Sequence, residues 1–403
     1  MISHRSRAAV TALAVTMLLA TSATAATALS APGATSAGQA VAAPTGPPVS
    51  TPSLELPRPT GPYATGRDTL HLTDTSRRDP WVPEAGARQV MVSLNYPARP
   101  GTGGGTAPYM TVDEARRLME AKGLEDAFPP ATVASTRTYS RTDARPAGGR
   151  FPLVVLSPGF NTPRTTLTGL AEELASRGYV VATVDHAYES TGTAFPGGRL
   201  LTCVACERLQ GTGREGMKRV SEGRAADLSF VLDRLTGRHP AWRHTGLIDR
   251  HRIGVAGHSI GGNAAASTMA TDSRVDAGVN MDGTFADPVP SSGLGGRPFL
   301  MLGSTVDHSP GGDDTWDGGW ASLDGWKRWL TVDGAGHFSF TDVPALAEQL
   351  GVEDPETPIS GDRATRITRD YVTAYFDLHL RGIHQPLLDG PVPAHPEVRF
   401  VTP

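Results

Sequence analysis

Cysteine, long apolar runs and clustered positive charge are all scarce in this chain of 403 residues. Beyond residue 25, no segment combines the length and the apolar composition of a transmembrane helix. The chain carries 37 Lys and Arg against 41 Asp and Glu without a basic patch, which argues against a nucleic-acid partner. Hydrophobic residues make up 39% of the sequence, which is enough to build a sizeable core.

The N-terminus has the pattern of a secretory signal peptide. Arg5 and Arg7 precede an apolar run over residues 8–20. Small residues at 23–25, or alternatively at 26–28, suit cleavage by signal peptidase. We therefore expect the leader to be removed and the protein to be secreted into the extracellular space. A retained N-terminal anchor is the alternative.

Composition divides the chain into three segments. Residues 1–25 form the leader. Residues 26–52 are rich in Ala, Pro, Gly and Ser and are expected to be disordered. Residues 53–403 are long for one domain, but they suit a single elaborated catalytic domain.

The two cysteines of the chain, Cys203 and Cys206, have C-x-x-C spacing. In an exported chain this spacing favours a local disulfide. Free thiols are the second interpretation. A metal site is the weakest, because no matching C-x-x-C or H-x-x-x-H pair follows to complete the ligand set.

The remaining chain alternates apolar runs with segments of helical periodicity. The predicted strands span residues 88–97, 151–156, 179–184, 253–256, 275–281, 298–303 and 326–332, and the predicted helices span residues 167–177, 217–235 and 367–380. The first of these strands alternates apolar and polar residues, which is typical of an antiparallel or edge strand. The alternation predicts an α/β fold with a mostly parallel central sheet and helices on both faces.

Two long segments, residues 101–150 and 186–216, interrupt this alternation. The first contains Thr111 and Glu114 at capping-box spacing, which predicts the start of a helix. We expect both segments to lie over the carboxyl edge of the sheet, where α/β folds bind their ligands.

The stretch around Ser259 organises the rest of the chain. Gly257 to Gly261 is a G-x-S-x-G pattern between an apolar strand and an Ala-rich helix. A turn this tight holds the serine in a strained backbone conformation, and a side chain at either glycine would collide with neighbouring backbone. The pattern predicts Ser259 as a nucleophile; a serine in an ordinary loop is the alternative.

A serine nucleophile needs a base, a carboxylate that orients the base, and donors for the oxyanion. His337 follows a predicted strand within a Gly-rich turn, which would let the imidazole reach back over the sheet, so His337 is the predicted base. His379 lies in the closing helix and is interpreted as a surface or packing residue. The other downstream histidines are His308, and His384 and His395 of the Pro-rich tail.

Two carboxylates compete for the role of the acid. Asp282 ends the strand that follows the nucleophile, and Asp307 follows the next strand, which is the commoner place in this architecture. The residues alone leave both open. Asp313, Asp314 and Asp317 are predicted to form a solvated loop rather than a calcium site.

The oxyanion donors are predicted to be backbone N–H groups. One is that of Ile260, directly after the nucleophile, and the other is that of Phe160 after the strand 151–156, with Gly159 as the close alternative. His258 is interpreted as a packing residue whose position aims it away from the serine hydroxyl. His186 either lines the pocket or is a hydrogen-bonded loop residue.

These motifs resemble the plasma-type platelet-activating factor acetylhydrolase family and its secreted bacterial relatives. The resemblance rests on Gly-His-Ser-Ile-Gly-Gly, Asn-Met-Asp-Gly and Gly-Ala-Gly-His-Phe-Ser-Phe, and on intervals of 23 residues from Ser259 to Asp282 and 55 from Asp282 to His337. It favours Asp282 over Asp307 as the acid, and it assigns the second oxyanion donor to Phe160. It spans roughly residues 58–385. Pro158, in place of the family's usual histidine, and the Cys203–Cys206 insert depart from the family pattern.

The resemblance implies an α/β-hydrolase fold and a serine ester hydrolase that needs no cofactor. Lipid esters are the implied substrates, short-acyl phospholipids first, with transient contact to a lipid surface. A broad carboxylesterase, a lipase or a polyester-cleaving cutinase is the alternative within the same mechanism. A peptidase and a non-catalytic binding protein on the same scaffold are remoter alternatives, and the oligomeric state is left open.

Overall fold

A computed structural model describes residues 52–352 and 354–402 of the chain. The predicted leader and nearly all of the low-complexity segment lie outside the described residues. The described residues belong to one compact unit. No helix in this part of the chain has the length and the apolar composition needed to cross a membrane.

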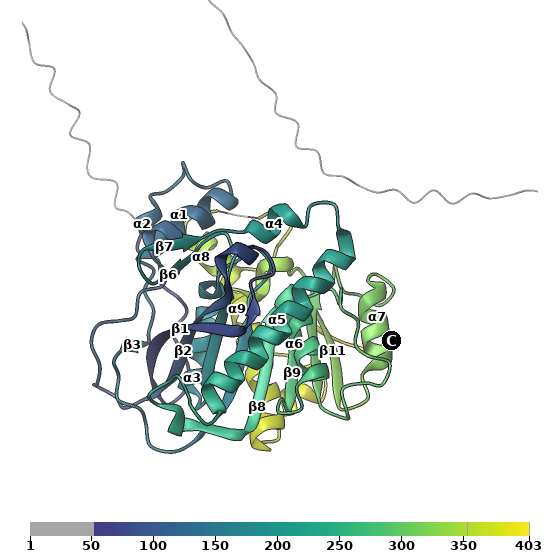
Figure 1. Ribbon diagram of the computed structural model, residues 1–403. Coiled ribbons are helices and arrows are strands. Elements are labelled where there is room, and N and C mark those ends of the chain that lie inside the picture. Colours follow the sequence, from purple (N-terminus) through teal and green to yellow (C-terminus); the bar gives the residue numbers. More distant parts are fainter. Residues whose placement is uncertain (1–51, 353, 403) are drawn as a thin grey trace, which may run out of the picture. The chain divides into compact units, whose positions relative to one another are not determined.

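The described part consists of a large sheet, a small hairpin and the helices packed around them (Figure 1). The strands are β1 (Ala64–Arg78), β2 (Ala87–Ala98), β3 (Arg141–Thr142), β4 (Phe151–Ser157), β5 (Val180–His186), β6 (Thr193–Phe195), β7 (Arg199–Leu201), β8 (Ile248–His258), β9 (Ala277–Met281), β10 (Phe299–Ser304), β11 (Lys327–Val332) and β12 (Val398–Val401). The α-helices are α1 (Val112–Ala121), α2 (Pro130–Ala134), α3 (Thr168–Ser176), α4 (Val204–Arg208), α5 (Gly213–Thr236), α6 (Ile260–Thr271), α7 (Asp314–Ser322), α8 (Val343–Gln349) and α9 (Gly361–Arg381). Short 3₁₀ helices are η1 (Pro83–Ala85), η2 (Arg164–Leu167), η3 (Thr245–Leu247), η4 (His337–Phe340) and η5 (Pro386–Leu388).

The large sheet has the strand order β12-β11-β10-β9-β8-β4-β5-β2-β1-β3. The six strands from β11 to β5 run parallel to one another. β2 is antiparallel to both of its neighbours, and β12 is antiparallel to β11. Helices lie in the connections from β4 to β5, β5 to β8, β8 to β9 and β10 to β11, whereas a loop without a helix joins β9 to β10. Because these strands are parallel, their carboxyl ends all meet at one edge of the sheet.

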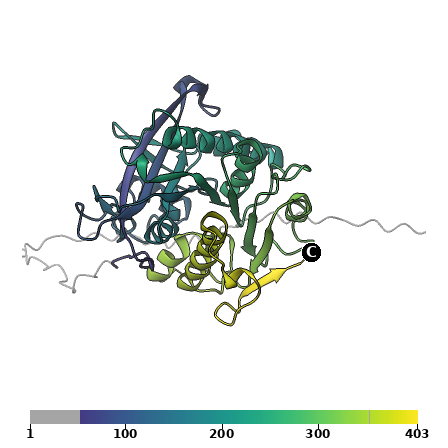
Figure 2. The ribbon, with the colours of Figure 1, turned by 90° about the horizontal axis from the view of Figure 1, so that it is seen from below.

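Helices cover both faces of the sheet, as the alternation predicts. The apolar sides of α5 and α6 pack on one face, and those of α3 and α9 pack on the other. Figure 2 shows this arrangement edge-on, with the teal and green helices α5 and α6 on one side of the strands and the yellow helix α9 on the other. The α/β-hydrolase class and the mostly parallel sheet predicted from the sequence are confirmed.

Several short elements were not predicted from the sequence, and three of the differences are instructive. β1 was not predicted, because its outward residues are polar and its stabilisation comes from pairing with β2 along nearly its whole length. β12 lies in the Pro-rich tail, where no strand was predicted. The prediction of a solvated loop at Asp313, Asp314 and Asp317 is wrong, because Asp313 caps α7 by accepting a hydrogen bond from the Thr315 N–H.

The two inserted segments lie partly at the carboxyl edge of the sheet. The first forms α1, whose start carries the predicted capping box at Thr111, and Lys122 at its end lies over the ring of Phe338, 3.3 Å from the centroid. The rest of this insert runs back along β1, where β3 pairs. The second insert forms the β6–β7 hairpin and α4. The first insert therefore reaches the residue next to the predicted base, and neither insert forms a separate domain.

Candidate active site

Ser259 lies in the tight turn between β8 and α6. Its φ of 56° and ψ of −128° are a strained conformation for a residue with a side chain. A Cβ atom added at Gly257 would lie 2.2 Å from the Gly261 carbonyl, and one added at Gly261 would lie 2.1 Å from the Ser157 carbonyl oxygen. Both glycines are therefore required by close backbone contact, as the motif predicts.

The structure brings the three predicted triad residues together. The Ser259 hydroxyl lies 2.9 Å from His337 Nε2, and His337 Nδ1 lies 2.7 Å from Asp282 Oδ2. Since His337 Nδ1–H donates a hydrogen bond to the Asp282 carboxylate, Nε2 is left as the acceptor for the serine proton. This is the hydrogen-bond chain that a serine nucleophile requires.

The Asp282 side chain is buried, whereas the His337 side chain is 42% exposed. Burial alone would raise the pKa of Asp282, but the hydrogen bond from His337 and the charge of His308 outweigh it, and the pKa is lowered below its ordinary value. The Ser304 N–H also donates to Asp282 Oδ1 at 2.6 Å. The carboxylate is thus held ionised where it can orient the imidazole.

Asp307, the competing acid, follows β10 and faces the same cleft. Its carboxylate accepts a hydrogen bond from the Ser304 hydroxyl at 2.9 Å. The structure therefore places Asp282, and not Asp307, against the imidazole of His337.

His308 is a second histidine next to the triad acid. Its Nε2 lies 3.7 Å from Asp282 Oδ1, its Nδ1 lies 3.2 Å from Asp313 Oδ2, and its ring stacks on Trp316 with centroids 4.1 Å apart. Burial lowers the pKa of His308, but the contacts with Asp313 and Asp282 more than offset this, and the pKa is raised. No sequence pattern singled out this residue for contact with Asp282.

His258 is buried beside the predicted base, and its Nε2–H donates to the His337 carbonyl oxygen at 2.7 Å. Burial and the neighbouring His337 lower the pKa of His258 to about 3, so its imidazole is neutral. His258 packs, as interpreted from the sequence, but it also fixes the backbone of the base. That contact joins residues 79 positions apart and has no local signature.

The remaining histidines lie away from the serine. His186 is buried behind the sheet edge, where it bonds the Ser157 hydroxyl at 3.0 Å and Asp227 at 2.8 Å, so the structure favours a hydrogen-bonded residue over a pocket-lining one. His379 packs on Trp326. The two tail histidines contact carboxylates: His384 lies near Asp389 and His395 near Asp370.

The two residues predicted to supply the oxyanion donors line the same cleft as Ser259. Ile260 is the first residue of α6, where an N–H has no partner within its own helix. Phe160 follows β4, and no acceptor contacts its N–H within the part of the chain that the structure describes. Gly159 precedes it, and an added Cβ there would lie 2.9 Å from His258 Nδ1. The arrangement suits an oxyanion between the two loops.

The triad opens into a cleft of about 690 Å³. Its lining combines apolar and polar side chains. Besides the three triad candidates and Gly312, the lining comprises the apolar residues Phe160, Met217, Ile260 and Ala286 and the polar residues Thr284, Asp307, His308, Asp313, Asp314 and Arg214. Arg214 of α5 pairs with Asp314 of α7 at 2.8 Å, which ties the two helix starts together at the cleft.

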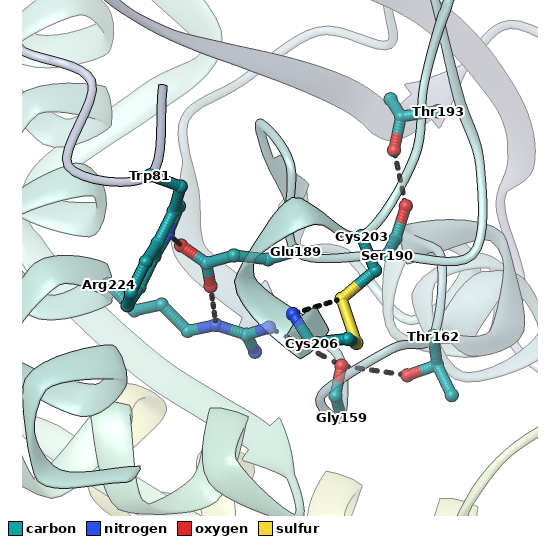
Figure 3. Close-up of a disulfide and its surroundings, with 9 residues drawn as sticks. All are labelled: Trp81, Gly159, Thr162, Glu189, Ser190, Thr193, Cys203, Cys206 and Arg224. Atoms are coloured by element: carbon teal, nitrogen blue, oxygen red, sulfur yellow. Dashed lines mark hydrogen bonds and ion pairs between the residues drawn. A yellow bond between two sulfur atoms is a disulfide. The ribbon is translucent and has the colours of Figure 1, made fainter. Parts of the chain in front are cut away.

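The structure joins Cys203 and Cys206 in a disulfide at the start of α4 (Figure 3). The Ala205 N–H of the same helix donates to the Tyr188 carbonyl at 3.0 Å. α4 thereby packs in the same apolar cluster as Ile260 and Phe160. In the described residues, no group of three or more His, Cys, Asp or Glu side chains could hold a metal ion.

Comparison with known proteins finds esterases. Residues 122–196 match the family model of platelet-activating factor acetylhydrolase, isoform II. The chain is 29% identical over 379 residues to a probable 1-alkyl-2-acetylglycerophosphocholine esterase of Arthroderma benhamiae, covering 87% of this chain and 94% of that protein. It is 26% identical to a bis(hydroxyethyl) terephthalate hydrolase of Streptomyces coelicolor, covering 47% of this chain and 52% of that protein.

A solved structure has a higher sequence identity to this chain than these two relatives. A ferulic acid esterase from Streptomyces cinnamoneus is 45% identical to this chain, with a TM-score of 0.78, and the match covers 87% of this chain and 100% of that structure. The similarity therefore extends over the whole catalytic fold of that esterase.

Proposed function

Because the chain belongs to the α/β-hydrolase esterases related to platelet-activating factor acetylhydrolase, we propose that Ser259, His337 and Asp282 form the catalytic triad of an exported ester hydrolase. The observation that carries the proposal is the continuous hydrogen-bond chain from Asp282 through His337 to the Ser259 hydroxyl. The N–H groups of Phe160 and Ile260 beside it support the same reading.

The reaction proceeds through an acyl-enzyme. The Ser259 oxygen bonds to the ester carbonyl carbon while its proton passes to His337 Nε2. The two N–H groups stabilise the resulting oxyanion. When the intermediate collapses, the bond to the leaving oxygen breaks and the alcohol takes the proton from His337. Water then attacks the acyl-enzyme with His337 as base, releasing the acid and restoring Ser259.

The lining of the cleft suits esters whose acyl group is aromatic and uncharged. The apolar lining residues Phe160, Met217 and Ile260 suit a flat acyl group. Thr284 and Asp307, which also line the cleft, offer partners for hydroxyl groups of the substrate. The 45% identity to a ferulic acid esterase supports feruloyl esters as the first substrate class.

A second substrate class is a phospholipid with a short acyl chain. The nearly full-length similarity to a probable 1-alkyl-2-acetylglycerophosphocholine esterase and the family match support it. The charges of the cleft do not rank the two classes, because phosphocholine is zwitterionic and the lining carboxylates Asp313 and Asp314 are paired with His308 and Arg214. Phospholipids rank second because the identity to the ferulic acid esterase is higher.

The test compares wild type with Ser259→Ala on methyl ferulate, 1-alkyl-2-acetylglycerophosphocholine and bis(hydroxyethyl) terephthalate. We expect kcat of Ser259→Ala to fall on the order of 10⁶-fold with an unchanged thermal unfolding midpoint. Ser292→Ala, an exposed serine, is the control. Full activity of Ser259→Ala would contradict the assignment of the triad. Acetyl-phospholipid turnover well above that of ferulate would keep the triad and exchange the order of the two substrate classes.

Export is part of the proposal, although the leader lies outside the described residues. Its support is the sequence of residues 1–25 together with the disulfide, because disulfides persist in oxidising compartments. Mass spectrometry of protein recovered from the culture medium should find an N-terminus that follows residue 25 or 28. A chain that retains residue 1 and sediments with membranes would contradict export.

A further inference from the structure

Side chains outside the proposed triad donate hydrogen bonds to the carbonyl oxygens of the loop that carries the Phe160 N–H. The Thr162 hydroxyl donates to the Gly159 carbonyl oxygen at 2.8 Å, and Arg224 Nη2 donates to the same oxygen at 3.4 Å. Arg224 Nη1 also donates to the Pro158 carbonyl oxygen. Figure 3 shows Thr162 and Arg224 converging on the Gly159 oxygen.

Arg224 is itself fixed by a buried carboxylate. Its Nε donates to Glu189 Oε2 at 2.8 Å, and both side chains are at most 2% exposed. Glu189 Oε1 accepts from Trp81 Nε1 at 2.8 Å and from Arg88 Nη2 at 2.7 Å. Burial alone would raise the pKa of Glu189, but Arg224 and Arg88 outweigh it and lower the pKa, so this carboxylate stays charged.

Holding the Gly159 carbonyl determines where the Phe160 N–H points. The two groups belong to one planar trans peptide unit and point in opposite directions across it. The donors that draw the Gly159 oxygen toward Arg224 and Thr162 therefore turn the Phe160 N–H the other way. Phe160 lines the cleft with Ser259 and Ile260, and its N–H has no acceptor within the described residues, which fits an oxyanion in that direction.

We propose that Thr162, Arg224 and Glu189 are positioning residues that fix the Gly159–Phe160 peptide as the second oxyanion donor. Donors that are already oriented before the reaction stabilise the developing charge without reorganising, which is why a backbone N–H needs such support. Side-chain substitution cannot delete a backbone N–H, but it can remove the groups that aim it. The inference rests on the proposed triad and adds residues that touch no substrate.

Thr162→Val is the decisive variant, because it removes the hydroxyl donor while keeping nearly the same shape. We expect kcat on methyl ferulate to fall about 10-fold with KM nearly unchanged, since one oxyanion donor is worth about 10²–10³-fold and Arg224 still holds the loop. The rate of labelling of Ser259 by a fluorophosphonate should fall in parallel, because the serine oxygen displaces fluoride through a five-coordinate phosphorus whose phosphoryl oxygen takes up negative charge and needs the same donors. Thr162→Ser, which keeps the hydroxyl, should restore both rates.

A second variant tests the arginine. Arg224→Lys keeps the charge opposite Glu189 but loses the fork that reaches two carbonyls, and we expect a fall in kcat of about 100-fold. Arg219→Lys, an exposed arginine of the same helix, is the control and should leave kcat unchanged. If Arg224→Lys does not fold, the Thr162 pair decides the question.

The outcomes separate this inference from the proposed function. Loss of activity in Ser259→Ala with wild-type kcat and labelling in Thr162→Val would keep the triad and overturn the positioning role. Equal losses in Thr162→Ser and Thr162→Val would also overturn it, because the hydroxyl would not be the cause. A fall in kcat and labelling confined to Thr162→Val and Arg224→Lys would support it.

Discussion

At the scale of single residues, Asp282 combines a carboxylate with an unusual backbone. Its φ of 58° lies in the left-handed region, which Asp and Asn tolerate better than most residues. A Cβ atom added at the next residue, Gly283, would lie 2.0 Å from the Ser259 carbonyl oxygen. The acid and the nucleophile are therefore held by one tight backbone contact as well as through His337.

Asp282→Asn tests the acid with little risk to the fold. Asn suits the left-handed backbone, but it presents an amide that cannot both orient His337 and stabilise its protonated form. We expect kcat to fall by about 10⁴-fold with an unfolding midpoint close to that of wild type. Asp307→Asn is the matched comparison and should lower kcat less than about 10-fold. The reverse ranking in steady-state assays would move the acid to Asp307.

His308 should make stability depend on pH in a defined direction. Its folded pKa is raised above the unfolded value of about 6.5. The contribution of His308 to the free energy of unfolding is therefore complete below about pH 6.5 and is lost as the pH rises through the folded pKa. The groups that face it are Asp282, Asp313 and the ring of Trp316.

We therefore expect His308→Gln to destabilise the protein more at about pH 5.5 than at about pH 9. The measurement is urea unfolding of both proteins at the two pH values. An equal loss of unfolding free energy at both would mean that His308 acts through packing on Trp316 and not through charge.

At the scale of elements, α4 is a short helix fastened by the Cys203–Cys206 disulfide. The closed loop contains about four residues, so the crosslink removes little freedom from the unfolded chain and contributes at most about 2 kcal/mol. Cys203 Sγ also accepts a hydrogen bond from the Cys206 N–H at 3.2 Å and so caps the helix.

Two double variants separate the crosslink from the cap. Cys203→Ser with Cys206→Ser keeps a capping oxygen and should lose no more than about 2 kcal/mol of unfolding free energy. Cys203→Ala with Cys206→Ser should lose about 1 kcal/mol more. Denaturant unfolding gives both values. A loss well above about 4 kcal/mol in the first variant would show that the disulfide holds more of the fold than α4.

Elements were predictable where burial leaves a local pattern. The central strands are continuous apolar runs, and α5 and α9 carry apolar stripes at helical spacing, so their existence follows from the sequence. β1 has no such run, because its partner strand and not its own composition makes it a strand. Sequence spacing likewise identified Ser259 and His337, while the choice of Asp282 needed the family resemblance.

Contacts between distant residues left no such signal. The bond from His258 to the His337 backbone joins residues 79 apart, and that from Arg224 to the Pro158 carbonyl joins residues 66 apart. Each depends on how loops meet at the sheet edge. Motifs therefore point to the proposed reacting groups, whereas the groups that hold them have no motif.

At the scale of the whole molecule, Asp342 is the buried carboxyl that should shape the pH dependence of stability. Burial raises its pKa to about 7, although the Gly169 N–H donates to it and Arg369 lies near. The folded state therefore binds this proton more tightly than the unfolded state, whose pKa is about 3.9. Stability from this group is complete below about pH 4 and is lost as the pH rises toward 7.

Asp342→Asn removes this titration. We expect the variant to be more stable than wild type at about pH 8 and no more stable at about pH 4, because the neutral amide carries no charge to bury. Thermal unfolding at both pH values measures the difference, with the exposed Asp126→Asn as the control. A variant that is less stable than wild type at both would show that the carboxylate is needed in its charged form.

The buried ionic cluster that packs against the Pro158–Phe160 loop should limit which positions of this protein tolerate random mutagenesis. Arg88 alone pairs with Asp79, Glu189 and Asp227, and all four side chains are nearly inaccessible. Substitution of one member leaves a buried charge without its ionic partner. This lowers the free energy of unfolding by about 3–5 kcal/mol, which is a large share of the stability of an ordinary domain. Random libraries should therefore return almost no survivors at these positions. A chimera with a homologue must exchange the cluster as one block.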